Sequence, residues 1–264
     1  MKLAVLGAGA IGGLVAAHLA HAGADVVVIA RGAALARLRE TGLRVIGPDG
    51  EIVAAPPATD DLAVIGSCDA VLLTIKATAI AAVAPALAAA LGPRTAIVTM
   101  QNGIPWWYFD RHGGPLDGTR LRTVDPGGAI AASLDSERVI GCVVYPAAEA
   151  VRPGVIRHVE GTRLALGELD GARTDRVLAI AETLGSAGFK APVRSGIRDE
   201  IWLKLLGNAT LNPLSALTRA RLDVMLADPA IAALAADLME EVASVARALR
   251  GPQGLSLGFV REGR

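Results

Sequence analysis

Three polar side chains recur at a spacing of four residues in the last third of the sequence: Lys204, Asn208 and Asn212. On a helix they would share one face, and their neighbours between residues 201 and 217 are largely apolar. Burying an ammonium group and two amides is costly unless they meet each other or a polar ligand. An ammonium group can protonate an alkoxide, and amides can orient a small acid without adding charge. The stripe therefore predicts a catalytic helix with Lys204 as the acid.

A purely structural role is the alternative for this stripe. The stem of Lys204 would lie along apolar neighbours with its ammonium in water, and the asparagines would cap a kink at Pro213.

A glycine-rich segment near the N-terminus predicts a dinucleotide site. It follows a short apolar strand and opens a helix, which is the context that the G-x-G-x-x-G fingerprint requires. The free N–H groups of that helix would face an anion. The residues of the fingerprint are Gly7, Ala8, Gly9, Ala10, Ile11 and Gly12.

The residue after the second strand indicates which dinucleotide binds. An acidic residue there would take the ribose 2′-hydroxyl, but this chain has Arg31. A guanidinium fits a 2′-phosphate, so the sequence predicts NADP as the cofactor. A solvated loop cation is the alternative for Arg31.

Two further candidates follow predicted strands. Lys76 closes the strand around 71–75, and Asn102 follows the strand that ends at Met100. Ligands bind at the carboxyl ends of strands in such sheets, so both are predicted to contact the cofactor. A surface charge and a plain turn at Asn102-Gly103 are the alternatives.

The elements that would position these residues follow an α/β pattern. Short β-branched runs alternate with alanine-rich helical stretches, as in βαβ units around a parallel sheet covered on both faces. We expect a hairpin turn at 47–50, a later helix at 174–187 and only helices after 197. Strands at 139–145, 155–159 and 163–166 are expected to extend the sheet in antiparallel fashion. The main expected strands are 3–6, 26–30, 70–75 and 96–100, and the helices 12–22, 33–40 and 79–91.

This pattern predicts two domains. Residues 1–194 would form an N-terminal Rossmann-type dinucleotide-binding domain, and residues 195–264 an all-helical C-terminal domain that carries the catalytic helix.

Composition narrows the class of partner. Lys plus Arg (26) balance Asp plus Glu (26), so the chain lacks the basic excess typical of proteins that bind nucleic acids or anionic membranes. A small-molecule substrate is the expected partner. The first 24 residues imitate a signal peptide, but glycines interrupt the apolar run at strand-turn-helix spacing, which favours a cytoplasmic protein. No metal site is expected, because the histidines lack companions at ligand spacing.

Two remaining features leave alternatives open. Cys68 and Cys142 are far apart in apolar stretches, which suits reduced thiols, although a disulfide is compatible with the sequence. The aromatic run from Trp106 to Phe109 follows Asn102 directly. It would serve as a lid or substrate wall, or as packing anchors or dimer contacts, and we favour the second role, packing or dimer contact.

The order and spacing of five features resemble the ketopantoate reductase (2-dehydropantoate 2-reductase) family. These features are the glycine fingerprint, Arg31, Lys76, Gln101-Asn102-Gly103 and the segment 153–158. The segment 201–217 looks like the catalytic helix of that family. The resemblance implies a helical domain like the C-terminal domain of 6-phosphogluconate dehydrogenase, reduction of 2-dehydropantoate with NADPH, and a place in pantothenate biosynthesis. It also implies that Asn208, Asn212 and Asn102 bind the 2-oxo acid.

The sequence departs from the family near its end. The helical domain is shorter, no late serine or glutamate can be matched, and a leucine, Leu222, stands where the family has a further substrate-binding asparagine. Glu240, Glu241 and Ser256 are not assigned as sites. Two alternatives therefore stay open: a reductase or dehydrogenase for another 2-oxo or 3-hydroxy acid, and an NADPH-binding protein without turnover. A shortened helical domain would also favour pairing as a homodimer.

Overall fold

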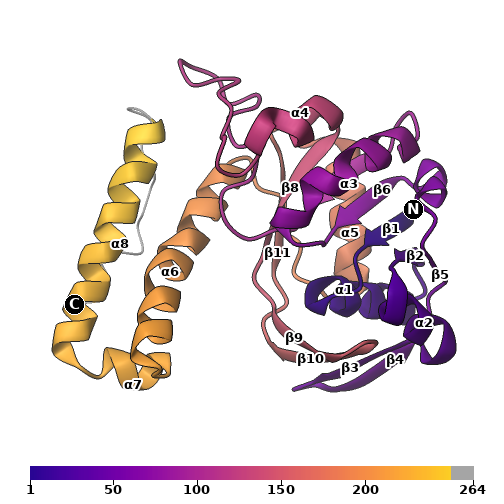
Figure 1. The fold of residues 1–264 in the computed structure, drawn as a ribbon, viewed down its shortest axis with the longest axis horizontal. Coiled ribbons are helices and arrows are strands. Elements are labelled where there is room, and N and C mark those ends of the chain that lie inside the picture. The colour runs from indigo at the N-terminus through magenta and orange to yellow at the C-terminus, as the bar shows by residue number, and fades with distance from the viewer. Residues whose placement is uncertain (251–264) are drawn as a thin grey trace. The chain divides into compact units, whose positions relative to one another are not determined.

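The computed structural model describes residues 1–250 of the chain. It divides into two compact units, of which the first spans Met1–Ile197 and the second begins at Arg198. The first unit contains every strand of the described chain, and the second is helical (Figure 1). The predicted α/β class with a helical C-terminal region is confirmed.

A seven-stranded sheet forms the centre of the first unit. Its order is β11-β8-β7-β6-β1-β2-β5, and all neighbours are parallel except the β11–β8 pair. Strands β6, β7 and β8 are uncharged and fully buried, as the continuous apolar runs of the sequence predict. The strands are β1 (Lys2–Leu6), β2 (Asp25–Ile29), β5 (Ala58–Thr59), β6 (Ala70–Leu73), β7 (Ala96–Thr99), β8 (Val139–Val144) and β11 (Leu164–Glu168).

A second, four-stranded sheet has the order β4-β3-β10-β9. Its strands are β3 (Leu43–Gly47), β4 (Gly50–Ala54), β9 (Ala147–Arg152) and β10 (Val155–Glu160). The predicted turn at 47–50 does join an antiparallel hairpin, β3–β4. The expected antiparallel extension of the main sheet is wrong in two respects. Strand β8 joins that sheet in parallel, and β10 pairs in parallel with β3 in the small sheet instead.

Helix α1 (Ala10–His21) lies between the two sheets and contributes Leu14, Val15 and Leu19 to the main hydrophobic core. The first turn of α1 packs closely against β10, because a Cβ atom on Gly13 would come within 2.9 Å of the Ile156 side chain. This close packing explains why small residues dominate the first half of the helix.

The other helices of the first unit connect and cover strands (Figure 1). The Oγ of Thr174 accepts a hydrogen bond from the N–H of Val177 at the start of α5, and Arg176 reaches back to the buried Glu168 carboxylate of β11 at 2.6 Å. These contacts tie α5 to the edge of the sheet. The helices are α2 (Gly32–Thr41), α3 (Ala77–Ala90), α4 (Ala129–Ser133) and α5 (Asp175–Ser186), with 3₁₀ turns at Leu62–Ser67, Pro126–Gly128 and Ser136–Arg138.

The helical unit contains α6 (Ile197–Thr218) from its second residue onward, α7 (Leu222–Leu226) and α8 (Pro229–Arg250). A small cluster of Leu214, Met225 and Ala235 joins the three. Asp228 caps α8 by accepting the N–H of Ala230 at 2.8 Å, and Pro229 occupies the first helical position, where its missing N–H costs nothing. The predictions for residues 251–264 lie outside the described residues.

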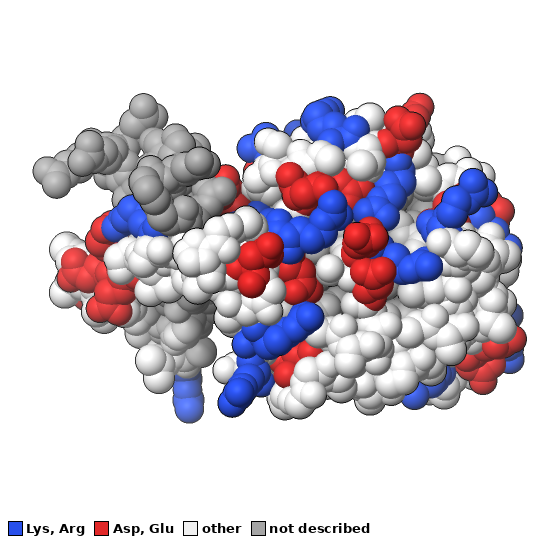
Figure 2. Space-filling view, turned by 90° about the horizontal axis from the view of Figure 1, so that it is seen from above, with Lys and Arg blue, Asp and Glu red and all other residues white. Residues whose placement is uncertain are grey.

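Acidic and basic side chains are interspersed on the face of the protein in Figure 2. Elsewhere on the first unit, ion pairs such as Arg44–Glu51 and Arg157–Glu149 lie on the small sheet. The face in Figure 2 carries no broad field of one sign, in keeping with the balanced charge of the sequence.

Candidate functional site

The glycine-rich turn between β1 and α1 has the geometry of a phosphate cradle. Gly7 has a φ of +115°, which favours glycine, and a Cβ atom on Gly12 would come within 1.9 Å of the Gly7 carbonyl oxygen. A Cβ atom on Gly9, in contrast, would meet nothing within 4 Å. The turn therefore needs Gly12 to close, whereas Gly9 leaves backbone open to an incoming ligand.

Thr74 braces this turn from the neighbouring strand end. Its hydroxyl donates to the carbonyl oxygens of Leu6 (3.0 Å) and Gly7 (2.9 Å). Thr74 was not predicted as a site residue, because its hydrogen-bond partners Leu6 and Gly7 are distant in sequence, by 68 and 67 residues.

A cleft of about 650 Å³ opens in front of the turn. Arg31 lies in its wall, exposed, at the N-terminal end of α2, and its guanidinium is suited to bind a phosphate. Asp60 also lines the cleft, and its Oδ1 lies 3.9 Å from Arg39 Nη2; no motif in the sequence marks it as a site residue. The apolar side walls suit a flat ring, so the residues present fit a dinucleotide. The lining residues are Leu6, Gly7, Ala8, Gly9, Ile29, Ala30, Arg31, Ala34, Asp60, Leu62, Ile75, Ala79 and Val83.

The other two candidates of this unit lie at the ends of β6 and β7. Lys76 is exposed and precedes α3, next to Ile75 in the cleft wall. Asn102 is exposed on the turn after β7. Gln101, which the sequence did not indicate as a site residue, holds this turn: its Nε2 donates to the carbonyl oxygens of Leu73 (2.6 Å) and Ile75 (2.9 Å).

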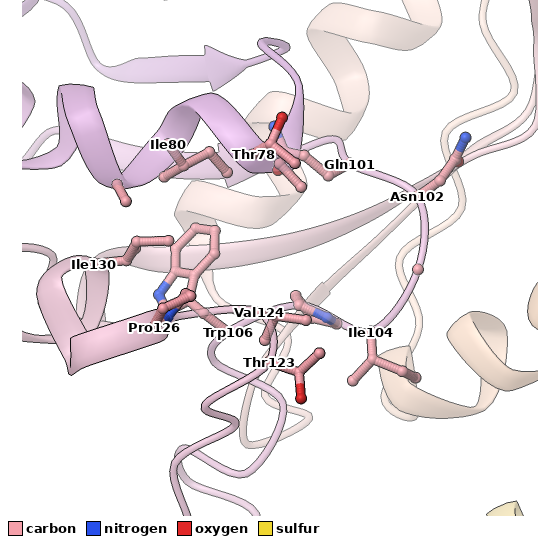
Figure 3. Close-up of a pocket in the computed structure, with 14 residues that line it drawn as sticks. Thr78, Ile80, Gln101, Asn102, Ile104, Trp106, Thr123, Val124, Pro126 and Ile130 are labelled. Atoms are coloured by element: carbon pink, nitrogen blue, oxygen red, sulfur yellow. The ribbon is translucent and has the colours of Figure 1, made fainter.

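A second cavity, of about 450 Å³, lies between α3 and α4 (Figure 3). The Trp106 ring stands in its wall, near Ile80 and Ile130, and the Asn102 side chain points away from that apolar wall. The lining residues are Ala77, Thr78, Ile80, Ala81, Gln101, Asn102, Gly103, Ile104, Pro105, Trp106, Thr123, Val124, Pro126 and Ile130.

The aromatic run is buried rather than displayed as a lid. Trp107, Tyr108 and Phe109 are each at most 5% exposed, and the Trp107 indole N–H donates to Thr99 Oγ1 at 3.0 Å. Trp107 also packs on β8, since a Cβ atom on Gly141 would come within 2.8 Å of its ring. These residues are packing anchors, as the sequence favoured, and Trp106 alone of the run lines the second cavity.

The predicted catalytic stripe lies in the helical unit, on α6, which runs through Pro213 as one helix. Lys204 and Asn208 are half-buried, and Asn212 is exposed. The expected burial therefore holds for the first two residues and is wrong for Asn212. The neighbours Ile201, Trp202 and Leu206 are buried, so the first two turns of the stripe are bordered by apolar side chains.

Three general features complete the description of residues 1–250. No group of three or more His, Cys, Asp or Glu side chains in this range is placed to hold a metal ion. Within the same range, no helix has both the length and the apolar character needed to cross a bilayer. Cys68 and Cys142 are buried and form no disulfide, and burial raises the pKa of Cys68.

Comparisons with known proteins match both parts of the chain. Residues 3–106 match the family described as "Ketopantoate reductase PanE/ApbA", and residues 196–258 match "Ketopantoate reductase PanE/ApbA C terminal". A 2-dehydropantoate 2-reductase of Mesorhizobium japonicum is 49% identical over 250 residues, which are 94% of this chain and 77% of that protein.

Solved structures agree with these matches. A protein of Ralstonia solanacearum, 42% identical, superposes with a TM-score of 0.87 over 92% of this chain and 76% of its own. A 2-dehydropantoate 2-reductase of Geobacter metallireducens is 26% identical, with a TM-score of 0.79 over 98% of this chain and 80% of its own.

Proposed function

Because this chain belongs to the ketopantoate reductase family, we propose that it reduces 2-dehydropantoate to pantoate with NADPH, a step of pantothenate biosynthesis in the cytoplasm. The observation that carries the proposal is that the family match includes both the nucleotide cleft and the helix with Lys204. Residues 1–194 would bind the nucleotide, and residues 195–264 would supply the acid.

The cleft supports a dinucleotide cofactor. When bound, NADPH supplies the hydride that reduces the carbonyl carbon. The glycine turn offers N–H groups and open backbone at Gly9 to the pyrophosphate, and Arg31 offers a guanidinium to a 2′-phosphate. Lys76 and Asn102, at neighbouring strand ends, would hold the remainder of the cofactor.

The polar stripe of α6 supports the acid-base half of the reaction. As the carbonyl carbon gains a hydride, its oxygen becomes an alkoxide, and Lys204 Nζ stabilises it and gives up one proton. Asn208, Asn212 and Asn102 orient the 2-oxo acid by hydrogen bonds. The products are a 2-hydroxy acid and the oxidised nucleotide, so hydride and proton are both accounted for.

A second candidate is reduction of a different 2-oxo acid or oxidation of a 3-hydroxy acid. It is favoured by Leu222, an apolar and partly exposed side chain where the family resemblance places a substrate-binding asparagine. We also propose that two copies pair through the helical unit, because its large apolar side chains Leu217 and Val224 are 82% and 62% exposed and a second copy would cover them.

The test is NADPH oxidation by the purified protein with 2-dehydropantoate and a panel of other 2-oxo acids. We expect Lys204→Met to lower kcat by about 10²- to 10⁴-fold, the usual contribution of a positioned general acid, while the NADPH dissociation constant stays unchanged. Lys190→Met, at an exposed lysine of the first unit, is the matched control.

Three other results would change the assignment. Turnover of another acid but not of 2-dehydropantoate would select the second candidate. NADPH binding without turnover of any acid would indicate a binding protein, and full activity of Lys204→Met would remove Lys204 from the mechanism.

A further inference from the structure

The cavity between α3 and α4 differs in chemistry from the nucleotide cleft. Every lining residue in the described chain is uncharged. Ile80, Trp106 and Ile130 form a buried apolar base, whereas Thr78 and Thr123 are exposed. At about 450 Å³ the cavity is within the range of roughly 300–1,000 Å³ that holds small organic ligands. These properties suit a neutral molecule with an apolar ring.

Helix α3 separates this cavity from the nucleotide cleft. Ala79 and Val83 of α3 line the cleft, whereas Ile80 and Ala81 line the cavity. The Asn102 amide, expected to contact cofactor and substrate, points away from the apolar wall (Figure 3). A molecule on the apolar wall of the cavity would therefore lie apart from the nucleotide cleft and from the Asn102 amide.

The walls of the cavity are built into the fold. The Asp125 carboxylate is buried and accepts the N–H groups of Ile130 and Ala131, both at 3.0 Å, which fixes the start of α4. Gln101 fixes the opposite wall through the carbonyl oxygens of Leu73 and Ile75. A preformed site of this kind orders few groups when it binds.

Two polar atoms in these walls lack partners. Gln101 Oε1 and Trp106 Nε1 are buried and have no hydrogen-bond partner among the described residues. The Gln101 amide cannot turn over without cost, because its nitrogen already serves two carbonyl oxygens. Both atoms are covered in the structure, so a polar group of a ligand would reach them only after a small shift of the wall.

Gln101 also connects the cavity to the cleft. It lines the cavity and donates to the carbonyl oxygen of Ile75, whose side chain lines the cleft. A ligand that packs against Gln101 and the turn after it would hold the end of β6 in the arrangement that shapes the cleft. Binding at one site then favours binding at the other, and the coupling is reciprocal.

We propose that this cavity is a regulatory site: a small neutral molecule with an apolar ring binds there and strengthens NADPH binding. The coupling uses the nucleotide cleft assigned above, but the binding of the ring does not require catalysis.

The test uses 4-fluorophenol as the probe, followed by fluorine NMR, with NADPH affinity measured by calorimetry. We expect saturable binding of the probe and a dissociation constant for NADPH that falls at least about fivefold at saturation, the lower end of measured couplings. 4-Fluorobenzoate, which carries a charge that the wall does not compensate, should bind at least about tenfold more weakly.

Substitutions locate the effect. Ala81→Leu fills the cavity and should abolish both probe binding and coupling. Thr78→Leu, at an exposed position of the lining, should weaken both, and it replaces the first variant if that one folds poorly. Ala86→Leu, on the exposed side of the same helix, should change neither.

Absence of saturable binding, binding that survives Ala81→Leu, or an unchanged NADPH affinity would each overturn the proposal. Failure of NADPH to bind the protein without probe would instead count against the nucleotide cleft, and the probe titration alone would still decide whether the ring binds.

Discussion

At the scale of single residues, chemistry-bearing side chains were predictable where the motif is local. The spacing of the glycines and of Lys204, Asn208 and Asn212 is visible in the sequence itself. Thr74 and Gln101 were not predictable, because they act through hydrogen bonds to carbonyl groups of other strand ends. The exposure of Asn212 was missed because periodicity assigns a face of the helix without saying what covers it.

Arg31 provides a prediction at this scale. Arg31→Ala should raise the dissociation constant of NADPH about 10- to 100-fold, the loss expected for charge-assisted hydrogen bonds, and leave that of NADH nearly unchanged. Titration of the nucleotide fluorescence measures both. Arg37→Ala, which removes an arginine paired with Glu40 on the same helix, is the control. Equal losses for the two nucleotides would show that Arg31 does not read the 2′-phosphate.

At the scale of elements, the buried strands were placed within two residues because continuous apolar runs identify them. Their partners were not all predictable. Strand β10 lies more than a hundred residues beyond β3 in the chain, and the alternation of side chains says which face is buried but not which strand is next to it. Strand β9 was missed because its six residues are mostly exposed and carry little apolar signal.

The packing of α1 yields a prediction about pH. The His18 ring lies 4.9 Å from that of Phe189, and its Nδ1 lies 3.2 Å from the Ala187 carbonyl oxygen. Burial lowers the pKa of His18, with smaller contributions from the neighbouring histidines, against the carbonyl contact, which raises it. The folded protein therefore binds this proton less readily than the unfolded chain, whose histidine titrates near 6.5. The stabilising contribution is complete above that pH and declines as the pH falls through it.

Urea unfolding at pH 7.5 and pH 5.5 tests this expectation. The wild-type protein should lose unfolding free energy at the lower pH, and His18→Gln should lose less of it. His21→Gln, at the exposed end of the same helix, should keep most of the wild-type dependence, because His21 makes the smallest contribution to the pKa of His18. An identical pH dependence in His18→Gln and the wild type would exclude His18 as its source.

At the scale of the whole molecule, the sequence changes near Ser195 from a mixed α/β pattern to a purely helical one. This change predicts the division of the chain into two domains. The structure gives the first unit a core of its own, drawn from residues 3–189. Ile197 belongs to that unit as well, since Cβ atoms on Gly141 and Gly167 would each come within 2.8 Å of its side chain.

A fragment of residues 1–197 is therefore expected to fold, to bind NADPH with an affinity within about threefold of that of the full chain, and to lack turnover. Circular dichroism, calorimetry and the reductase assay check the three expectations in turn. A shorter fragment that ends at residue 194 lacks Ile197 and should be less stable to heat. A fragment 1–197 that is unfolded would show that the helical unit is needed to complete the first.

The two glycines of the cofactor turn have different evolutionary prospects. Any residue other than glycine adds a Cβ atom, and at Gly12 that atom has no space, so the position is fixed by the closure of the turn whether or not a nucleotide binds. Gly9 faces open space, and only an approaching pyrophosphate forbids a side chain there. In a lineage that stopped using the cofactor, drift would begin at Gly9 while Gly12 persisted. Among relatives with this fold, a retained Gly12 therefore indicates only that the turn must close, whereas a retained Gly9 indicates that the nucleotide still binds.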